Sequence, residues 1–216
     1  MAEPRLLPLG EEAWLLAFGD RIDPALHRRV TAVAEAIEAA ALPGVRDVVP
    51  AYTTVGVYFD ALNTDAAALG RALLGLAAAT PDSAGRTDSR LVEIPVRYDG
   101  PDLDEVASRL GLTAEDVARR HAAREYRVYL LGFAPGFAYL GELDPSLELP
   151  RRDAPRTAVP AGSVAIAGLQ TAVYPLRTPG GWHLIGSTAL RLYDPARQPP
   201  VLLRPGDRVR FVPVPA

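Results

Sequence analysis

The sequence predicts an α+β protein of two domains, a small α/β domain over residues 1–84 and a β-barrel over residues 85–216. In the first part, short apolar runs alternate with two helical patterns, whereas the last part holds short apolar runs separated by glycine and proline. Residues 80–89 between them are polar and rich in turn formers, as linkers are. A chain of 216 residues, about half of them hydrophobic, can bury two modest cores.

The first domain is predicted to follow a β-β-α-β-β-α order. Asp23 followed by Pro24 predicts the start of the first helix, and Thr64 is expected to cap the second. The predicted strands of this domain cover residues 5–9, 13–18, 45–50 and 53–59. Such an order favours a small sheet with both helices packed on one face.

A strand at residues 90–98 is expected to open the second domain. Two short helices follow, and their starts are predicted by two pairs that resemble capping boxes, Asp102 with Glu105 and Thr113 with Asp116. The remaining predicted strands cover residues 126–131, 163–167, 171–176, 182–185, 189–193 and 208–212. Short strands with glycine and proline between them suit a closed or strongly curved barrel.

Composition excludes several classes of function. A formal net charge of -3 leaves no basic excess to neutralise a phosphate backbone, so we expect no nucleic-acid partner. Residues 1–10 do not form a secretion signal and no apolar run is long enough to span a bilayer, so we expect a cytoplasmic protein without membrane contact. The absence of cysteine removes disulfides and thiolate nucleophiles.

All 23 side chains of the lysine and arginine type are arginine, and there is no lysine. Arginine stays protonated at any accessible pH. The chain therefore cannot form a Schiff base, carry biotin on lysine, use Ser-Lys amidase chemistry or supply the lysine of a Walker-type phosphate loop. If the reaction uses ATP or a covalent carrier, the conventional lysine belongs to another chain.

Three segments between residues 131 and 186 carry unusual residues. In residues 132–137, glycines flank a proline, which permits a tight turn that holds two aromatic rings. In residues 150–160, prolines alternate with Arg151, Arg152 and Arg156, so we expect a stiff loop without regular hydrogen bonding. Guanidinium groups on such a loop suit recognition of a carboxylate or phosphate, although solvated arginines on a rim are the alternative.

The third segment is Pro179–Trp182. Its consecutive glycines let a ligand or another backbone approach closely, and the indole supplies an apolar wall. The alternative is a plain hairpin turn with a buried tryptophan.

Local signals for catalysis are weak. Ser163 lacks the spacing of a nucleophile elbow. His27, His121 and His183 lie far apart and none has the spacing of metal ligands, so no metal site is expected. His121 lies four residues after Val117 on a predicted helix, which favours a partly buried histidine over a catalytic one.

Five segments together resemble the allophanate hydrolase subunit 1 family, which includes the B subunit of bacterial 5-oxoprolinase and the Kip-type inhibitor of a sporulation histidine kinase. The resemblance extends over nearly the whole chain. The segments that carry it are Tyr126–Leu140, Pro150–Gly168, Gln170–Tyr174, Pro179–Gly186 and Leu203–Val214.

The resemblance implies a cyclophilin-like barrel after a smaller, ferredoxin-like domain. It also implies a non-autonomous member of an ATP-dependent complex that opens 5-oxo-L-proline to L-glutamate. The implied partners are a second cyclophilin-like protein, the C subunit of 5-oxoprolinase, and a third, the A subunit. ATP with magnesium would act in the complex, and its site can lie on another chain. No metal or prosthetic group is expected on this chain. The alternative implied function is inhibition of a sensor histidine kinase.

Site residues can be expected as well, although no catalytic residue, and His121 is included because the family pattern places a histidine ahead of Tyr126–Tyr129. The expected substrate-binding residues are Arg156, Ser163, Gln170, Tyr174, Trp182 and His121. The expected partner interface or pocket wall consists of Phe133, Pro135, Gly136, Phe137, Tyr139, Gly180 and Gly181. All the expected substrate-binding residues except His121 flank glycine turns, so we expect them to face one concavity.

The chain departs from the family pattern at two positions. Ser187 stands where the family usually carries arginine, and Ala189 where it usually carries proline. An anion-binding role of that arginine would put the substrate assignment in doubt, whereas a surface role would change nothing.

Overall fold

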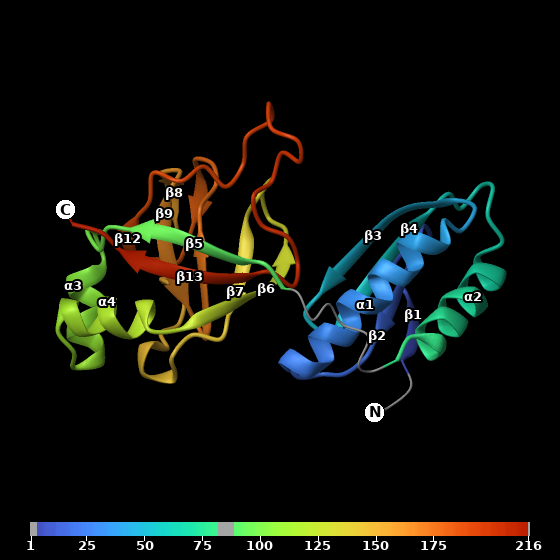
Figure 1. The fold of residues 1–216 in the computed structure, drawn as a ribbon, viewed down its shortest axis with the longest axis horizontal. Helices are drawn as coiled ribbons and strands as arrows, with labels where there is room; N and C mark the ends of the chain where they lie inside the picture. The colour runs from blue at the N-terminus through green and yellow to red at the C-terminus, as the bar shows by residue number, and fades with distance from the viewer. Residues whose placement is uncertain (1–3, 82–88, 216) are drawn as a thin grey trace. The chain divides into compact units, whose positions relative to one another are not determined.

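The computed structural model describes residues 4–81 and 89–215. By its internal contacts the chain divides into two compact units, Met1–Asp88 and Ser89–Ala216, each with its own hydrophobic core (Figure 1). The predicted domain boundary between residues 84 and 85 lies outside the described residues. No helix within the described ranges has both the length and the apolar character of a membrane span.

The first unit is a four-stranded antiparallel sheet with two helices, and its predicted β-β-α-β-β-α order is confirmed. The strands lie in the order β1-β2-β4-β3. The bounds are β1 Arg5–Pro8, β2 Ala13–Ala17, α1 Pro24–Ala40, β3 Val45–Ala51, β4 Thr54–Phe59 and α2 Ala66–Ala79. Buried side chains of both helices and of β2, β3 and β4 form one core, which explains the apolar periodicity of all these segments.

The helix starts of this unit follow local capping. The Asp23 carboxylate accepts hydrogen bonds from the backbone N–H groups of Ala25 and Leu26, so α1 begins where the sequence predicts. The prediction that Thr64 caps α2 is wrong. The helix begins one residue later, and the Asp65 carboxylate accepts from the backbone N–H of Ala68 at 2.9 Å.

The second unit is built on a seven-stranded, barrel-like sheet in the order β12-β9-β10-β7-β6-β13-β5. The strands are β5 Leu91–Val96, β6 Glu125–Leu131, β7 Ala138–Gly141, β9 Ser163–Ala167, β10 Gln170–Val173, β12 His183–Ser187 and β13 Arg208–Pro213. Of the strand pairs in the described part of this unit, β5 with β13 is the parallel one. A bridge between Arg97 and Ser187 joins the chain after β5 to the other edge strand, so the sheet nearly closes.

Two helices and a small hairpin complete this unit. They are α3 Leu103–Leu110, α4 Ala114–Ala122 and the pair β8 Arg156–Val159 and β11 Thr178–Gly180, with a 3-10 turn η1 at Pro145–Leu147. Side chains of α3 and α4 pack into the main core with those of the seven-stranded sheet. The capping box of Thr113 and Asp116 at the start of α4 is confirmed.

Three local predictions for this unit are wrong. Asp102 precedes α3, but its carboxylate makes no capping hydrogen bond and binds distant groups instead. The residues predicted as a loop without regular hydrogen bonding at 150–160 include strand β8, because β11 supplies partners for it. Residues 189–193 form no strand. Tyr193 forms an isolated bridge to Val201, and the prolines between them lack the N–H groups that a ladder needs.

Candidate functional site

Strands β9 and β10 have buried side chains on both faces, and this separates the predicted site from the main core. Because side chains alternate along a strand, Val164 and Ile166 point into the main core while Ala165 points to the opposite face. On that opposite face, Tyr174 and Trp182 join a second apolar cluster. The candidate site lies on this second face.

Five aromatic rings, here called the aromatic cluster, gather on this face. The members are Phe133, Phe137, Tyr139, Tyr174 and Trp182. The ring of Phe137 lies at its centre, 4.9 to 5.9 Å from the other four ring centroids in edge-to-face contacts. Phe137, Tyr174 and Trp182 are buried and Tyr139 is half-buried, whereas Phe133 is 61% exposed. The cluster is therefore a buried wall with one ring at its edge.

Glycine turns allow the rings to meet. A Cβ atom on Gly180 would lie 2.2 Å from the Tyr174 hydroxyl oxygen, so no larger residue fits there without displacement. The backbone N–H of Trp182 donates to the Tyr174 hydroxyl, although burial is the larger effect and raises the pKa of Tyr174. In the loop before β7, Gly136 has a positive φ of 78° and Phe133 one of 69°.

A second group of side chains, here called the arginine clamp, consists of Asp102, Arg152 and Arg156. Asp102 Oδ1 accepts hydrogen bonds from Arg156 Nη2 at 2.6 Å and Arg152 Nη1 at 3.0 Å, and Oδ2 accepts from the backbone N–H of Leu184 at 2.7 Å. Only 4% of the Asp102 side chain is exposed. Burial alone would raise the pKa of Asp102, but hydrogen bonds from Arg156 and Leu184 and the arginine charges outweigh it and hold the pKa below 3.8.

The arginine clamp and the aromatic cluster share the turn that contains Gly180, Gly181 and Trp182. Arg156 pairs with Gly180 between β8 and β11, and the backbone N–H of Arg152 donates to the carbonyl oxygen of Gly181 at 2.8 Å. The guanidinium of Arg151 lies 5.9 Å from the Trp182 ring centroid. Cationic and aromatic groups thus meet at one turn.

The structure brings together most of the predicted site residues. Arg156, Tyr174 and Trp182 join through the shared turn, together with the predicted wall residues Phe137 and Tyr139. The rest of the predicted wall lies in the turns that carry these rings, at Phe133, Pro135, Gly136, Gly180 and Gly181.

Two further predicted residues lie on the same face but at its margins. Ser163 is buried beside the cluster, and its carbonyl oxygen accepts the Tyr174 N–H at 2.9 Å. Gln170 is half-buried at the start of β10, two residues before Ala172 of the same face. Both therefore flank the cluster from neighbouring strands.

His121 is not brought to this face. It is fully buried in the main core, where Nδ1 lies 2.8 Å from the Tyr98 hydroxyl and Nε2 lies 2.8 Å from Thr171 Oγ1. Because the Thr171 hydroxyl donates to the carbonyl oxygen of Ala165, it accepts from Nε2–H, and Nδ1 accepts from Tyr98. Burial lowers the pKa of His121 to about 3, so this histidine is a neutral link between α4 and β10.

Sequence reasoning missed Asp102 as a member of the site and Gly100 as its support. A Cβ atom on Gly100 would lie 2.3 Å from the carbonyl oxygen of Leu184, so the chain before α3 presses directly against β12. The signal present in the sequence was the run Gly100-Pro101-Asp102, in which glycine permits close approach.

The unusual Ser187 also has a local partner. Its hydroxyl donates to Asp99 Oδ1 at 2.7 Å, and the other Asp99 carboxylate oxygen lies 3.3 Å from Arg97 Nη2. A carboxylate is therefore already within reach of a basic side chain at position 187.

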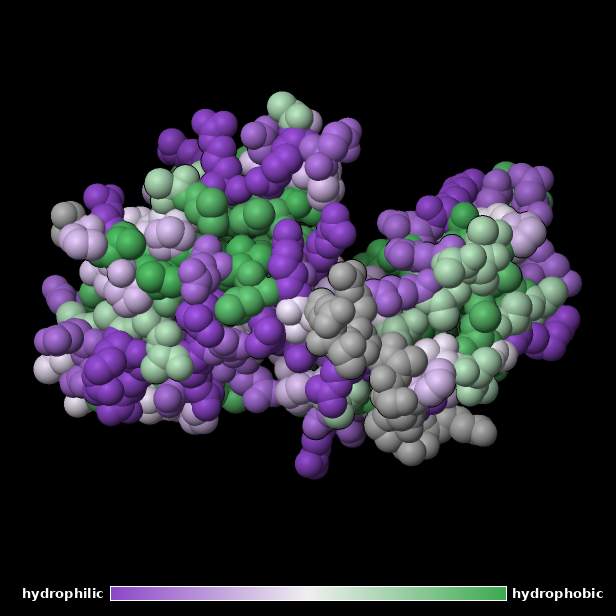
Figure 2. Space-filling model, in the orientation of Figure 1, coloured by the Kyte–Doolittle hydropathy of each residue, from purple (hydrophilic) through white to green (hydrophobic). Residues whose placement is uncertain are grey.

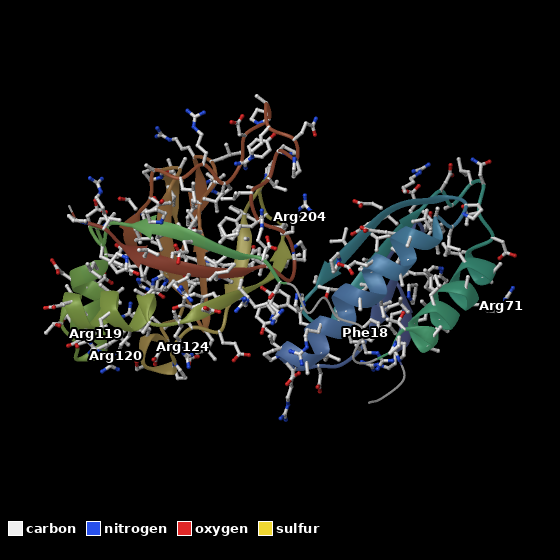
Figure 3. The ribbon with its side chains drawn as sticks, in the orientation of Figure 1. Phe18, Arg71, Arg119, Arg120, Arg124 and Arg204 are labelled. Atoms are coloured by element: carbon white, nitrogen blue, oxygen red, sulfur yellow. The ribbon has the colours of Figure 1, made fainter. Side chains whose placement is uncertain are left out.

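Arginines also gather away from the clamp, at Arg119, Arg120 and Arg124 on and after α4 (Figure 3). Arg119 pairs with Asp116 at 2.6 Å, and Arg124 donates to carbonyl oxygens of the chain after β7. These contacts stabilise the helix start and a loop.

The chemical capacity of the face is binding and orientation. Arg156 Nη1 and Arg152 Nε are buried without a hydrogen-bond partner among the described residues, so two guanidinium groups retain unused donors. Within residues 4–81 and 89–215, no three His, Cys, Asp or Glu side chains are placed to hold a metal ion. Guanidinium donors beside aromatic rings suit a small planar anion.

One family model and two curated relatives each match most of the chain. The family model of the carboxyltransferase domain, subdomain C and D, matches residues 4–203. The chain is 42% identical to the B subunit of 5-oxoprolinase from Bacillus subtilis over 94% of this chain and 90% of that protein. It is 45% identical to the B subunit of 5-oxoprolinase from Escherichia coli O157:H7 over 99% of this chain and 97% of that protein.

Among solved structures, TTHA0988 is 48% identical and superposes with a TM-score of 0.85 over 94% of this chain. The match spans only 40% of the length of TTHA0988, so that chain contains a large further part. The family model and the two relatives each cover most of this chain. The chain therefore belongs to the carboxyltransferase domain family, subdomain C and D.

Proposed function

We propose that this chain is the B subunit of an ATP-dependent 5-oxoprolinase complex that opens 5-oxo-L-proline to L-glutamate. The observation that carries the proposal is the identity of 42% and 45% to two proteins named as the B subunit of 5-oxoprolinase, over nearly the whole of each chain. In the complex, the face with the arginine clamp and the aromatic cluster forms one wall of the substrate site.

The chemistry of the face supports this substrate. 5-Oxoproline is a small ring with a planar amide and one carboxylate, and the guanidinium side chain of Arg156, which is 27% exposed, suits the carboxylate. Apolar and aromatic surface beside it suits the ring. Arg156, Gln170, Tyr139 and the Gly180–Gly181 turn are partly exposed and provide the contacts, while the buried Tyr174 and Trp182 shape the wall from behind.

The loop of residues 132–137 supports a partner protein. Phe133 combines a positive φ with a largely exposed ring, and a non-glycine residue in that conformation costs about 1 kcal/mol or more. A neighbouring protein that covers the ring compensates this cost. Figure 2 shows apolar and charged side chains intermixed on the visible face of the second unit. We assign the loop to contact with a second cyclophilin-like protein, the C subunit, in an assembly that includes the A subunit.

The same proposal covers the cofactor, the location and the finer fold. ATP with magnesium acts on another chain of the complex, because a chain without lysine lacks the conventional phosphate-binding side chain. The complex is cytoplasmic and this chain is inactive alone. The strand order β1-β2-β4-β3 with two helices supports a ferredoxin-like first domain, and the nearly closed sheet supports a cyclophilin-like second domain.

The decisive assay combines the chain with the A and C subunits and follows glutamate release from 5-oxoproline and ATP. We expect turnover only with all three proteins present. Glutamate release at the full rate with this chain omitted, or by this chain alone, would refute the proposal.

The partner contact is tested with Phe133→Ser. We expect the dissociation constant for the C subunit to rise roughly tenfold or more, as for an aromatic residue at an interface. The matched control is Leu62→Ser, which removes an even more exposed apolar side chain, 94% exposed, from the first unit. Equal weakening by both substitutions would exclude a specific role of the loop.

A further inference from the structure

We infer that Asp102 is a positioning residue of the substrate site, which it serves by holding Arg156 and the Gly180–Trp182 turn in place for a substrate carboxylate. The inference rests on the proposed function and adds a residue that touches no substrate itself. It is drawn from the contacts of one buried carboxylate, which joins three separate segments of the second unit.

Asp102 is bound to strand β12 at Leu184. Asp102 and Leu184 share two hydrogen bonds: the Asp102 carboxylate accepts the Leu184 N–H at 2.7 Å, and the Asp102 N–H donates to the Leu184 carbonyl at 3.0 Å. Leu184 lies two residues after Trp182, in β12. The close approach of Gly100 to the same strand leaves no room for sliding. Asp102 therefore fixes the strand that follows the indole.

Asp102 also orients both guanidinium groups of the arginine clamp. Arg156 Nη2 and Arg152 Nη1 both donate to Asp102 Oδ1, so one oxygen anchors both side chains. Arg152 also donates to Glu105 Oε2 at 3.1 Å on the exposed side. Arg156 is bound through Nη2 alone, and its buried Nη1 has no acceptor among the described residues. The Arg156 side chain as a whole is 27% exposed, and we assign this exposed part, held in place through Nη2, to contact with the substrate carboxylate.

The three side chains of the arginine clamp carry more positive than negative charge. Two arginines share the one buried carboxylate of Asp102, so the clamp has one positive charge in excess. Glu105 pairs with Arg152 on its exposed side and forms no ion pair with Arg156 among the described residues. A helix cap would not require this arrangement. Asp102 makes no capping bond to α3, whereas Thr113 caps α4 in the usual way. The Asp102 carboxylate therefore binds the arginines of the candidate site instead of capping its own helix.

The test uses the assembled complex and measures KM for 5-oxoproline, KM for ATP and kcat. We expect Asp102→Asn to raise KM for 5-oxoproline roughly tenfold or more, because hydrogen bonds to charged groups are weakened, while KM for ATP stays within about twofold. The matched control is Asp207→Asn. Asp207 is also buried and also accepts from an arginine, Arg90 at 2.7 Å, and from a backbone N–H, but it lies before β13.

A double-variant cycle separates positioning from general destabilisation. If Asp102 acts through Arg156, the pair Asp102→Asn and Arg156→Gln raises KM for 5-oxoproline no more than Arg156→Gln alone. The inference would be overturned if the increases in KM of the two single variants multiplied in the double variant. It would also be overturned if Asp207→Asn raised KM for 5-oxoproline as much as Asp102→Asn does. If Asp102→Asn does not assemble, Arg156→Gln is measured by itself, and an unchanged KM for 5-oxoproline overturns it equally.

The outcomes for the two proposals are distinct. A wild-type complex that turns over 5-oxoproline while Asp102→Asn leaves its KM unchanged refutes the positioning role and keeps the proposed function. A wild-type complex that releases no glutamate refutes both.

Discussion

Acid should destabilise the second unit through His121, and the substitution His121→Gln should remove that effect. The imidazole is fully buried and accepts at Nδ1 and donates at Nε2 only while it is neutral. Burial lowers its pKa to about 3, from an ordinary value of 6.5. Below pH 6.5 the unfolded chain therefore binds a proton that the folded chain excludes.

The direction and size of the change in unfolding free energy with pH follow from proton linkage. The contribution to stability is fully present above pH 6.5 and is lost as the pH falls from 6.5 toward 3. Each pH unit in that window costs about 1.4 kcal/mol, so acidification from pH 7 to pH 5 removes about 2 kcal/mol. The glutamine side chain does not take up a proton in this pH range. Losing the two hydrogen bonds should make the variant about 1 to 3 kcal/mol less stable at pH 7, and the gap should narrow by about 2 kcal/mol at pH 5.

The measurement is urea unfolding at pH 7 and pH 5, followed by tryptophan fluorescence. Both proteins carry Trp14→Phe, so that Trp182 reports the second unit alone. Carboxylates titrate equally in the two proteins and cancel in the comparison. Equal losses of unfolding free energy between pH 7 and pH 5 would show that His121 is not shielded and neutral, and would refute the reasoning.

Three further predictions concern stability. Gly100→Ala should cost about 3 kcal/mol or more, because its Cβ would lie 2.3 Å from a β12 carbonyl oxygen, whereas Gly75→Ala in α2 meets no atom within 4 Å and should stabilise by up to about 1 kcal/mol. Similar melting shifts for both would contradict the close approach. Ser187→Arg should change the unfolding free energy by less than about 1 kcal/mol because Asp99 is in reach, and a loss above about 2 kcal/mol in urea titrations would argue against that pairing. Thr113→Ala should cost about 1 kcal/mol by the same titration, and no measurable loss would mean that the capping box contributes nothing.

Elements with strong local signals were predictable. The Asp23-Pro24 start of α1 and the Thr113 capping box of α4 depend on a few neighbouring residues, and both are present. Strand β9 was predicted at its observed bounds. Strand β8 was not, because β11, its partner among the described residues, comes some twenty residues later, and a segment rich in proline carries little strand signal of its own.

The candidate site was predictable only in part. Glycine and aromatic runs indicated the segments of the aromatic cluster, since close approach and ring packing leave a compositional trace. The role of Asp102 was ambiguous in the sequence, because an acidic residue before a helix gives the same pattern whether it caps that helix or binds elsewhere. The face on which His121 lies also depends on how α4 packs on the sheet.

The sequence by itself determined the lysine-free chemistry, the starts of α1 and α4 and the segments that resemble the family. Each depends on composition or on residues a few positions apart. Only the tertiary structure decided that Asp102 binds Arg152, Arg156 and Leu184, which are 50, 54 and 82 residues away. The physical reason is that the residue type and its neighbours limit which groups a side chain can bind, whereas the packing of strands far apart in sequence decides which of those groups comes within hydrogen-bond distance.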